Sequence, residues 1–242
     1  MSSPRRERLL EIYRRLLDSY GPQHWWPGDD DPFVVVVGAI LTQSAAWKNV
    51  EAALARLREA DLLSTDALLE ASDEELERAV RPSGYFRMKA RKLKAFAMML
   101  AERFDGRLEG LFALPVEEMR TALLATYGIG PETADDIVLY AARKPAFVVD
   151  AYTRRIFDRL GIRPASDTYD AWRCLFVDSL PQDTALFNEY HALIVRHAKV
   201  VCRKERLCPD CPLLGVCPTG QSRLAEAEDG LMHDTMRAKT FE

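Results

Sequence analysis

Apolar residues recur at every third or fourth position along most of this chain, and this spacing is typical of one face of an α-helix. Residues that favour helix starts stand at the junctions: Ser72 and Asp73 precede EELERAV, and Pro115 precedes VEEMRTALLA. The segments with this pattern are Glu51–Leu63, Thr65–Val80, Ala90–Phe104, Val116–Thr126, Thr133–Ala142, Tyr152–Leu160, Ala171–Leu180 and Thr184–Val201. The first residues, MSSPRRERLLEIYRRLL, also read as a charged amphipathic helix. The pattern therefore predicts an all-α protein.

The segment Phe33–Leu41, FVVVVGAIL, departs from this pattern because its β-branched residues favour a buried strand. The chain offers only the short run Phe147–Val149 as a second strand. A lone strand cannot satisfy its backbone hydrogen bonds. We therefore expect Phe33–Leu41 to form a buried helix.

A glycine-containing turn joins two predicted helices in Leu123–Ala142, LLATYGIGPETADDIVLYAA. Pro131 suits the first position of the second helix, because that position needs no N–H donor. Gly128 and Gly130 leave backbone N–H groups bare at a helix N-terminus, where phosphate binds favourably. The segment predicts a helix-hairpin-helix that contacts DNA, and an ordinary αα-corner is the alternative.

Asp150 follows the apolar run AFVV and begins a predicted helix, in the context AFVVDAYTRRIFDRLGI. Aspartate at this position is a good helix N-cap, because its side chain accepts hydrogen bonds from the first N–H groups. Capping is compatible with a catalytic role for the same carboxylate.

Four cysteines, Cys202, Cys208, Cys211 and Cys217, lie in the run CRKERLCPDCPLLGVC. Four thiolates on so short a loop predict one metal centre, either zinc or an iron–sulfur cluster. Structural zinc sites favour paired knuckles, and only Cys208 and Cys211 form one, so the spacing favours a cluster. Disulfides are the alternative, but the chain shows no apolar secretory leader. The fifth cysteine, Cys174, lies in the apolar segment AWRCLFVDSL and is expected to be a buried core thiol.

Composition limits the classes of partner. The chain has 242 residues, 48% of them hydrophobic, and no stretch approaches the roughly 18 apolar residues of a membrane span. Its 33 basic and 37 acidic residues give a formal net charge of −4, so total charge does not indicate nucleic acid. Two local runs are basic, Arg81–Lys94 and Arg196–Arg206, and each alone reads as a solvated helix face. We expect a soluble, cytoplasmic monomer.

The hairpin and Asp150 occur together with a helix pattern, H-x-L-I-x-x-H from His191 to His197, and with the four-cysteine loop. This combination resembles the endonuclease III, or helix-hairpin-helix/Gly-Pro-Asp, superfamily of DNA glycosylases over roughly Asp31–Pro218. The resemblance implies damaged double-stranded DNA as the partner and a 4Fe-4S cluster on the four cysteines. The first cysteine gap has five residues, whereas endonuclease III usually has six.

The resemblance also implies two helical lobes. Residues 1–30 and 145–218 would form the lobe with the cysteine loop, and residues 31–144 would form the lobe with the hairpin at about 123–142. Residues 219–242 would form a tail.

Glu132 occupies the position at which bifunctional members of the superfamily carry a lysine in the second hairpin helix. The lysine amine forms a Schiff base with the sugar and leads to strand cleavage. The resemblance therefore implies a monofunctional enzyme without AP lyase activity. In that enzyme, Asp150 would stabilise the positive charge that develops on the sugar.

Trp25 and Trp26, in the run HWWP, resemble the paired tryptophans of the 3-methyladenine DNA glycosylase III branch. That branch also has a glutamate at the lysine position and a pocket lysine that matches Lys199. Aromatic stacking is strongest with a cationic, electron-poor base. The resemblance implies release of alkylated purines, with Trp25 or Trp26 as the stacking platform; packing between the lobes is the alternative role of this pair.

The superfamily pattern places Gln43 and Tyr85 as side chains that fill the hole left by the flipped base. The residues expected to contact the DNA backbone are Arg87, Lys89, Gly128, Gly130, Arg203 and Lys204. Two other functions stay open. One is a glycosylase for oxidised or deaminated pyrimidines or for mispaired bases, and the other is a non-catalytic DNA-binding protein.

Overall fold

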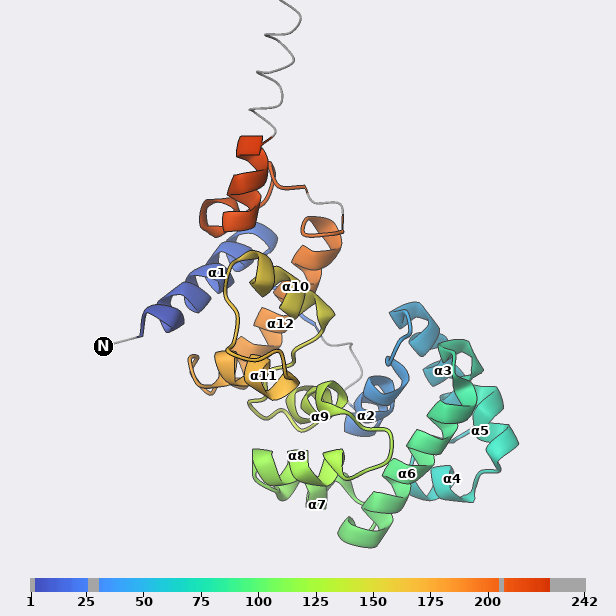
Figure 1. Ribbon diagram of the computed structural model, residues 1–242. Coiled ribbons are helices and arrows are strands. Elements are labelled where there is room, and N and C mark those ends of the chain that lie inside the picture. The colour runs from blue at the N-terminus through green and yellow to red at the C-terminus, as the bar shows by residue number, and fades with distance from the viewer. Residues whose placement is uncertain (1–2, 26–30, 205–206, 227–242) are drawn as a thin grey trace, which may run out of the picture. The chain divides into compact units, whose positions relative to one another are not determined.

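The computed structural model describes residues 3–25, 31–204 and 207–226, and within these ranges the chain forms helices, turns and loops without a strand (Figure 1). The predicted all-α class is confirmed. None of the helices in these ranges combines the length and apolarity needed to cross a bilayer. The helices group into two compact units. The first unit comprises Met1–Trp25, Val149–Pro181 and Ala185–Glu242, and the second unit comprises Trp26–Val148 and Gln182–Thr184.

An aromatic cluster centred on Tyr190 forms the core of the first unit. Its ring meets Tyr13, Phe157 and Phe176 edge-on at centroid distances of 5.2, 6.2 and 6.3 Å. Its hydroxyl donates a hydrogen bond of 2.8 Å to the carbonyl of Leu9. The helices joined in this way are α1 (Pro4–Tyr20), α10 (Ala151–Arg159), α11 (Tyr169–Val177) and α12 (Thr184–Val200). A short 3-10 helix, η3 (Leu214–Val216), follows in the cysteine loop.

The second unit is built around α2, which packs against α3, α6 and the π-helical turn η2. Its elements are α2 (Pro32–Leu41), α3 (Trp47–Glu59), α4 (Thr65–Glu70), α5 (Asp73–Val80), η1 (Arg81–Ser83), α6 (Phe86–Phe104), α7 (Leu108–Ala113), α8 (Val116–Leu124), α9 (Pro131–Asp136) and η2 (Ile137–Ala141).

The expected buried helix at Phe33–Leu41 is confirmed as α2. Asp31 caps it by accepting a hydrogen bond of 2.8 Å from the N–H of Phe33, and Pro32 occupies its first turn. Every residue from Phe33 to Leu41 is buried. A helix that is apolar on all sides suits this position, so burial overrides the strand propensity of four consecutive valines.

Two expectations differ from the structure. The segment Thr65–Val80 is divided into α4 and α5, because Ser72 caps α5 through the N–H of Glu75. The prediction of a buried thiol at Cys174 is wrong, since this residue is exposed. The apolar side of α11 presents Trp172 and Phe176 to the core instead.

Candidate active site and cysteine pocket

Asp150 is the N-cap of α10 and follows a buried extended run that ends at Val149. Its Oδ1 accepts hydrogen bonds from the N–H of Thr153 at 2.7 Å and from the Thr153 hydroxyl at 2.9 Å. Its Oδ2 lies 3.7 Å from Nε2 of His191 on α12, and the Asp150 side chain is 16% exposed. A partly accessible carboxylate is therefore held at a fixed position by two elements.

These contacts decide the ionisation of Asp150. Burial alone would raise the pKa of the carboxyl group. The nearby His191 imidazole, together with the two hydrogen bonds from Thr153, outweighs burial and holds the pKa below its usual value. The group is therefore ionised at neutral pH and can stabilise a positive charge beside it.

Trp25 lies in the same unit and contacts the same histidine. Its ring stacks on His191 with a centroid distance of 5.7 Å and an interplanar angle of 16°. The Lys199 ammonium lies 5.9 Å from the Trp25 ring centroid. The structure thus brings two predicted site residues, Asp150 and Trp25, against His191, and a third, Lys199, lies beside Trp25. Trp26 lies outside the described residues.

The role of His191 is what sequence reasoning missed. The residue was noted only as the first position of the H-x-L-I-x-x-H pattern. The pattern predicts that both histidines lie on one helix. It does not predict which residue His191 contacts, because Asp150 lies 41 positions earlier in the chain. The pattern's second histidine, His197, has a different neighbourhood, in the cysteine loop.

The predicted helix-hairpin-helix consists of α8, a turn at Gly128–Gly130, and α9 continued by η2. Gly128 adopts φ of +81°, which favours glycine, and Gly130 is the N-cap of α9. Gln43 holds this turn: its Nε2 donates to the Gly128 carbonyl at 3.1 Å and to the Thr133 hydroxyl at 2.8 Å. Lys92 donates to Oε1 of the same glutamine. Gln43 is therefore half-buried and engaged within the protein.

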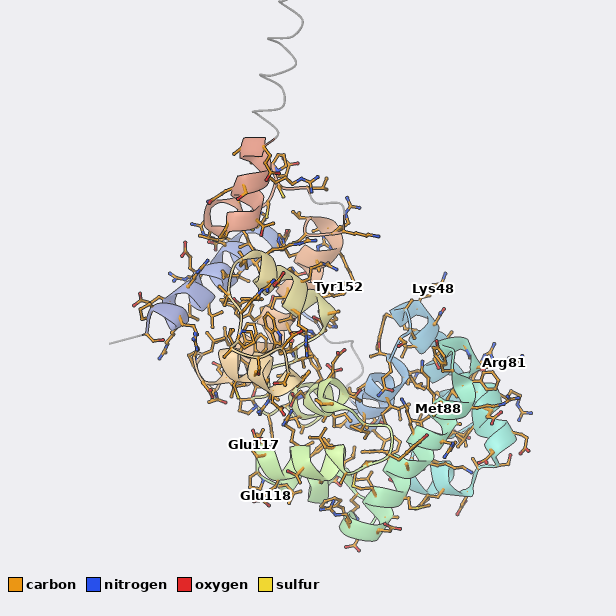
Figure 2. The ribbon with its side chains drawn as sticks, viewed as in Figure 1. Lys48, Arg81, Met88, Glu117, Glu118 and Tyr152 are labelled. Atoms are coloured by element: carbon orange, nitrogen blue, oxygen red, sulfur yellow. The ribbon has the colours of Figure 1, made fainter. Side chains whose placement is uncertain are left out.

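The second unit has exposed large side chains next to this turn, at Tyr127, and at the start of α6, at Tyr85 and Met88. Tyr85 is 74% exposed and has a left-handed backbone with φ of +44°. Tyr127 is exposed, and its hydroxyl donates to Sδ of Met88, which is labelled in Figure 2, at 3.0 Å. The Arg91 guanidinium lies 5.1 Å from the Tyr127 ring centroid. Aromatic faces next to cations are the chemistry that stacks on bases and neutralises phosphate.

The basic run on α6 does not act as one exposed strip. Lys89 is 2% exposed, and its ammonium donates to the carbonyls of Leu41 at 2.8 Å and Ser83 at 2.5 Å. Burial, aided by the charge of Lys92, lowers the pKa of Lys89 to about 8. The expectation that Lys89 contacts the DNA backbone is wrong in this structure, because its ammonium is enclosed. Arg87 is exposed, although it lies 3.6 Å from a carboxylate oxygen of Glu77.

The other predicted positions lie at the surface of their units. Glu132 is exposed in the first turn of α9, and Arg203 and Lys204 are exposed after the end of α12. The carbonyl of Arg203 accepts a hydrogen bond of 2.9 Å from Arg159. The Arg203 backbone is therefore tied to α10 while its side chain is accessible.

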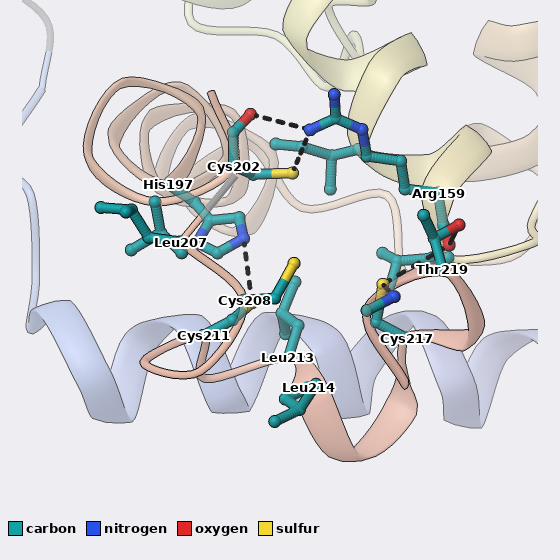
Figure 3. A pocket seen from close by; sticks show the side chains of 14 residues that line it. Arg159, His197, Cys202, Leu207, Cys208, Cys211, Leu213, Leu214, Cys217 and Thr219 are labelled. Carbon is teal, nitrogen blue, oxygen red and sulfur yellow. Dashed lines mark hydrogen bonds between the residues drawn. The ribbon is translucent and has the colours of Figure 1, made fainter. Parts of the chain in front are cut away.

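The four loop cysteines line a single pocket, together with Arg159 and His197 (Figure 3). Arg159 donates to Sγ of Cys202 at 3.1 Å, and the N–H of Gly220 donates to Sγ of Cys217 at 3.4 Å. His197, whose Nδ1 lies 2.8 Å from the hydroxyl oxygen of Tyr20, has its Nε2 3.8 Å from Sγ of Cys211. The donor set, four thiols with a guanidinium beside one of them, fits a thiolate-bound group in its chemistry.

The electrostatics of the pocket agree with that chemistry. Burial raises the pKa of Cys211 to about 11, and the charges of the other three cysteines raise it further against a lowering backbone hydrogen bond. Burial also raises the pKa of Cys217, so without a cation the thiols of Cys211 and Cys217 would stay protonated and metal binding to them would release protons. Within the described ranges, no three histidine, cysteine or acidic side chains lie close enough to share one ion. The predicted cluster therefore rests on the donor set and not on an assembled geometry.

Comparison with solved structures supports the fold. A complex of endonuclease III with DNA superimposes with a TM-score of 0.77 at 23% identity, covering 93% of this chain and 100% of that one. A 3-methyladenine DNA glycosylase of H. pylori bound to 1,N6-ethenoadenine superimposes with a TM-score of 0.67 at 26% identity. That alignment covers 81% of this chain and 97% of the H. pylori chain.

Sequence comparison shows the family. A candidate DNA repair glycosylase of Methanocaldococcus jannaschii is 43% identical over 213 residues, covering 87% of this chain and 96% of the relative. A thymine/uracil-DNA glycosylase of Pyrobaculum aerophilum is 30% identical, covering 90% and 92% respectively. The family described as HhH-GPD superfamily base excision DNA repair protein matches residues 37–182. The chain therefore belongs to the HhH-GPD superfamily of base excision DNA repair proteins, and it is a DNA glycosylase.

Proposed function

We propose that this glycosylase is monofunctional and releases alkylated purines such as 3-methyladenine from duplex DNA. One observation carries the proposal: an ionised carboxylate, Asp150, shares its neighbour His191 with an aromatic ring, Trp25. A charge that stabilises the sugar and a face that stacks on the base thus occur in one site. The likeness to the H. pylori enzyme, whose bound ligand is an alkylated adenine, supports the same substrate class.

Asp150 acts on the sugar in this mechanism. As the C1′–N bond breaks, its electron pair leaves with the base and positive charge develops on the sugar ring. The carboxylate stabilises that charge and orients the water that adds to C1′ and then loses a proton. An alkylated purine that is already cationic is a good leaving group and needs little acid assistance. A single carboxylate is therefore enough for this substrate class.

Glu132 explains the absence of strand cleavage in the proposal. A Schiff base with C1′ requires an amine at the hairpin position, and a carboxylate cannot form one. The expected products are the free base and an intact strand with an abasic site. Added alkali should then be required to convert that site into a nick.

DNA binding is assigned to surfaces in both units. We place Tyr85 in the gap left by the flipped base and Gly128 and Gly130 against phosphate, because the turn leads into the N-terminus of α9 and lies beside Lys92. Gln43 would hold the turn in place through its hydrogen bonds to Gly128 and Thr133. Arg87, Arg203 and Lys204 complete the set as exposed cations.

The four cysteines are proposed to hold a 4Fe-4S cluster, which when bound would cross-link the loop as a structural clamp. Arg159 would offset the negative charge of the thiolates through its contact with Cys202. The clamp would fix the backbone of Arg203 against α10.

A second substrate class is favoured by the P. aerophilum relative, which acts on thymine and uracil. One assay separates the two: a panel of duplexes, each with one lesion, incubated with the enzyme and analysed for released base with and without alkali. Faster release of 3-methyladenine and 1,N6-ethenoadenine than of mispaired thymine or uracil supports the proposal. Faster release of mispaired pyrimidines would replace it, and nicks without alkali would contradict the assignment to Glu132.

A further inference from the structure

His191 lies between the carboxylate and the aromatic ring of the proposed active site. Its Nε2 is 3.7 Å from Oδ2 of Asp150, and its ring stacks on Trp25 at 5.7 Å and 16°. The His191 side chain is 8% exposed, so both contacts are made by a buried imidazole. One imidazole thus contacts both functional groups.

We propose that His191 is a positioning residue that couples the base platform to the catalytic carboxylate. This inference rests on the proposed function and deepens it. His191 does not touch the substrate; it acts through Asp150 on the sugar and through Trp25 on the base.

The contacts of Asp150 explain why a second anchor is needed. Both Thr153 donors meet Oδ1, at 2.7 and 2.9 Å, as an N-cap residue normally does. An N-cap alone fixes one oxygen and leaves the carboxyl plane to rotate about it. His191 approaches Oδ2, the oxygen that the cap does not use, and therefore sets the direction in which the second oxygen faces.

The contacts of Trp25 tie the platform to the same helix. Gln23 donates its N–H to Oε1 of Glu189 at 2.7 Å, and Glu189 lies two positions before His191 on α12. The next residue, His24, has φ of +47°, a strained conformation that turns the chain before Trp25. The Trp25 ring is thus anchored on α12 in two ways, by the preceding loop through Gln23 and Glu189 and by its stacking on His191.

Two substitutions separate the two functions of His191. His191→Phe keeps an aromatic ring for Trp25 and removes the nitrogen that faces Asp150. His191→Gln keeps a polar N–H for Asp150 and removes the stack. Asn188→Ala on the same helix is the control, because it changes α12 without touching either group.

The coupling predicts opposite patterns for these variants. With excess enzyme on the best lesion substrate, His191→Phe should slow base release on the order of 100-fold, the scale of a misplaced catalytic group, with little change in DNA affinity. His191→Gln should preserve much of the rate but weaken half-saturation roughly threefold to tenfold, the scale of one aromatic stack. Equal losses of rate and affinity in both variants, or no loss in either, would overturn the proposal.

A fluorescence measurement without substrate tests the contact between His191 and Trp25 separately from catalysis. Trp25 emission, taken as the difference between each protein and its Trp25→Phe version, should change in His191→Gln and far less in Asn188→Ala. An unchanged Trp25 signal in His191→Gln would also overturn the proposal. Because the assay uses whichever lesion the wild type processes, a wrong substrate class leaves the His191 result readable.

Discussion

The site around Asp150 and the turn around Gly128 lie in different units and have opposite electrostatics. At Asp150, hydrogen bonds from Thr153 and the nearby His191 imidazole lower the pKa of a carboxyl group. At the Gly128 turn, the cation Lys92 meets Gln43, and burial lowers the pKa of the Lys92 ammonium. The first site is suited to a positive transition state and the second to a polyanion. The difference teaches that the rate of base release and the affinity for DNA should respond to different substitutions.

The largest change should come from the cysteine pocket, which adjoins the end of α10 opposite to Asp150. Cys208→Ser combined with Cys211→Ser removes two of the four sulfur ligands of the proposed 4Fe-4S cluster. If the loop holds that cluster, the double variant should lose its iron and several kcal/mol of unfolding free energy. Iron analysis and chemical denaturation measure both. The exposed Cys174→Ser is the matched control. Unchanged iron content and stability in the double variant would mean that this loop holds no metal.

Gly128→Ala should weaken DNA binding with little effect on the rate once DNA is bound. An added Cβ would overlap Cγ of Lys92 and lie 2.7 Å from its Cδ, and φ of +81° is strained for alanine by about 1 to 3 kcal/mol. Gly106→Ala is the control, since Gly106 lies outside the hairpin, has a similar φ of +75°, and its added Cβ would meet only Thr65 at ordinary contact distances of 3.7 and 3.9 Å. Equilibrium titration with lesion DNA gives the affinities. Equal behaviour of the two variants would remove the special role of the Gly128 turn.

Lys89 should make the free energy of unfolding depend on pH in the alkaline range, where the Asp150 carboxyl group does not titrate. Its pKa is about 8 in the folded protein, against about 10.4 in an unfolded chain. Between these values the unfolded chain binds a proton that the folded protein does not, so stability should rise with pH across this window. Lys89→Met should flatten that rise in denaturation curves, whereas the surface variant Lys94→Met should keep it. A wild-type stability that falls from pH 8 to 10 would contradict the buried ammonium.

The smallest effect concerns selectivity at the Asp150 site. The Lys199 ammonium lies 5.9 Å from the Trp25 ring, where it would repel a cationic base. Lys199→Met should therefore favour cationic 3-methyladenine over neutral 1,N6-ethenoadenine, shifting the ratio of their release rates about threefold to fivefold, the scale of one exposed cation–π contact. Exposed Arg196→Met on the same helix should leave the ratio unchanged. A shift toward the neutral base would assign Lys199 a contact with the base rather than repulsion.

The sequence was most informative where local chemistry determines structure. Helical spacing predicted most helices, Asp150 was expected and found at a helix start, and burial made a helix of FVVVVGAIL. Contacts between distant segments were not predictable in this way. The pairing of His191 with Asp150 and the enclosure of the Lys89 ammonium by carbonyls of Leu41 and Ser83 depend on tertiary packing. Periodicity also failed at Cys174, because an apolar segment does not tell which side of α11 faces the core.

Asp150→Asn tests the central claim most directly. Asparagine caps a helix about as well as aspartate, so α10 and DNA affinity should persist while the negative charge is lost. Base release from a duplex with one alkylated purine, measured with excess enzyme, should fall by a factor on the order of 1,000, at the upper end of what loss of one charge-stabilising group costs. A variant that binds the duplex normally and releases the base at the wild-type rate would contradict the account.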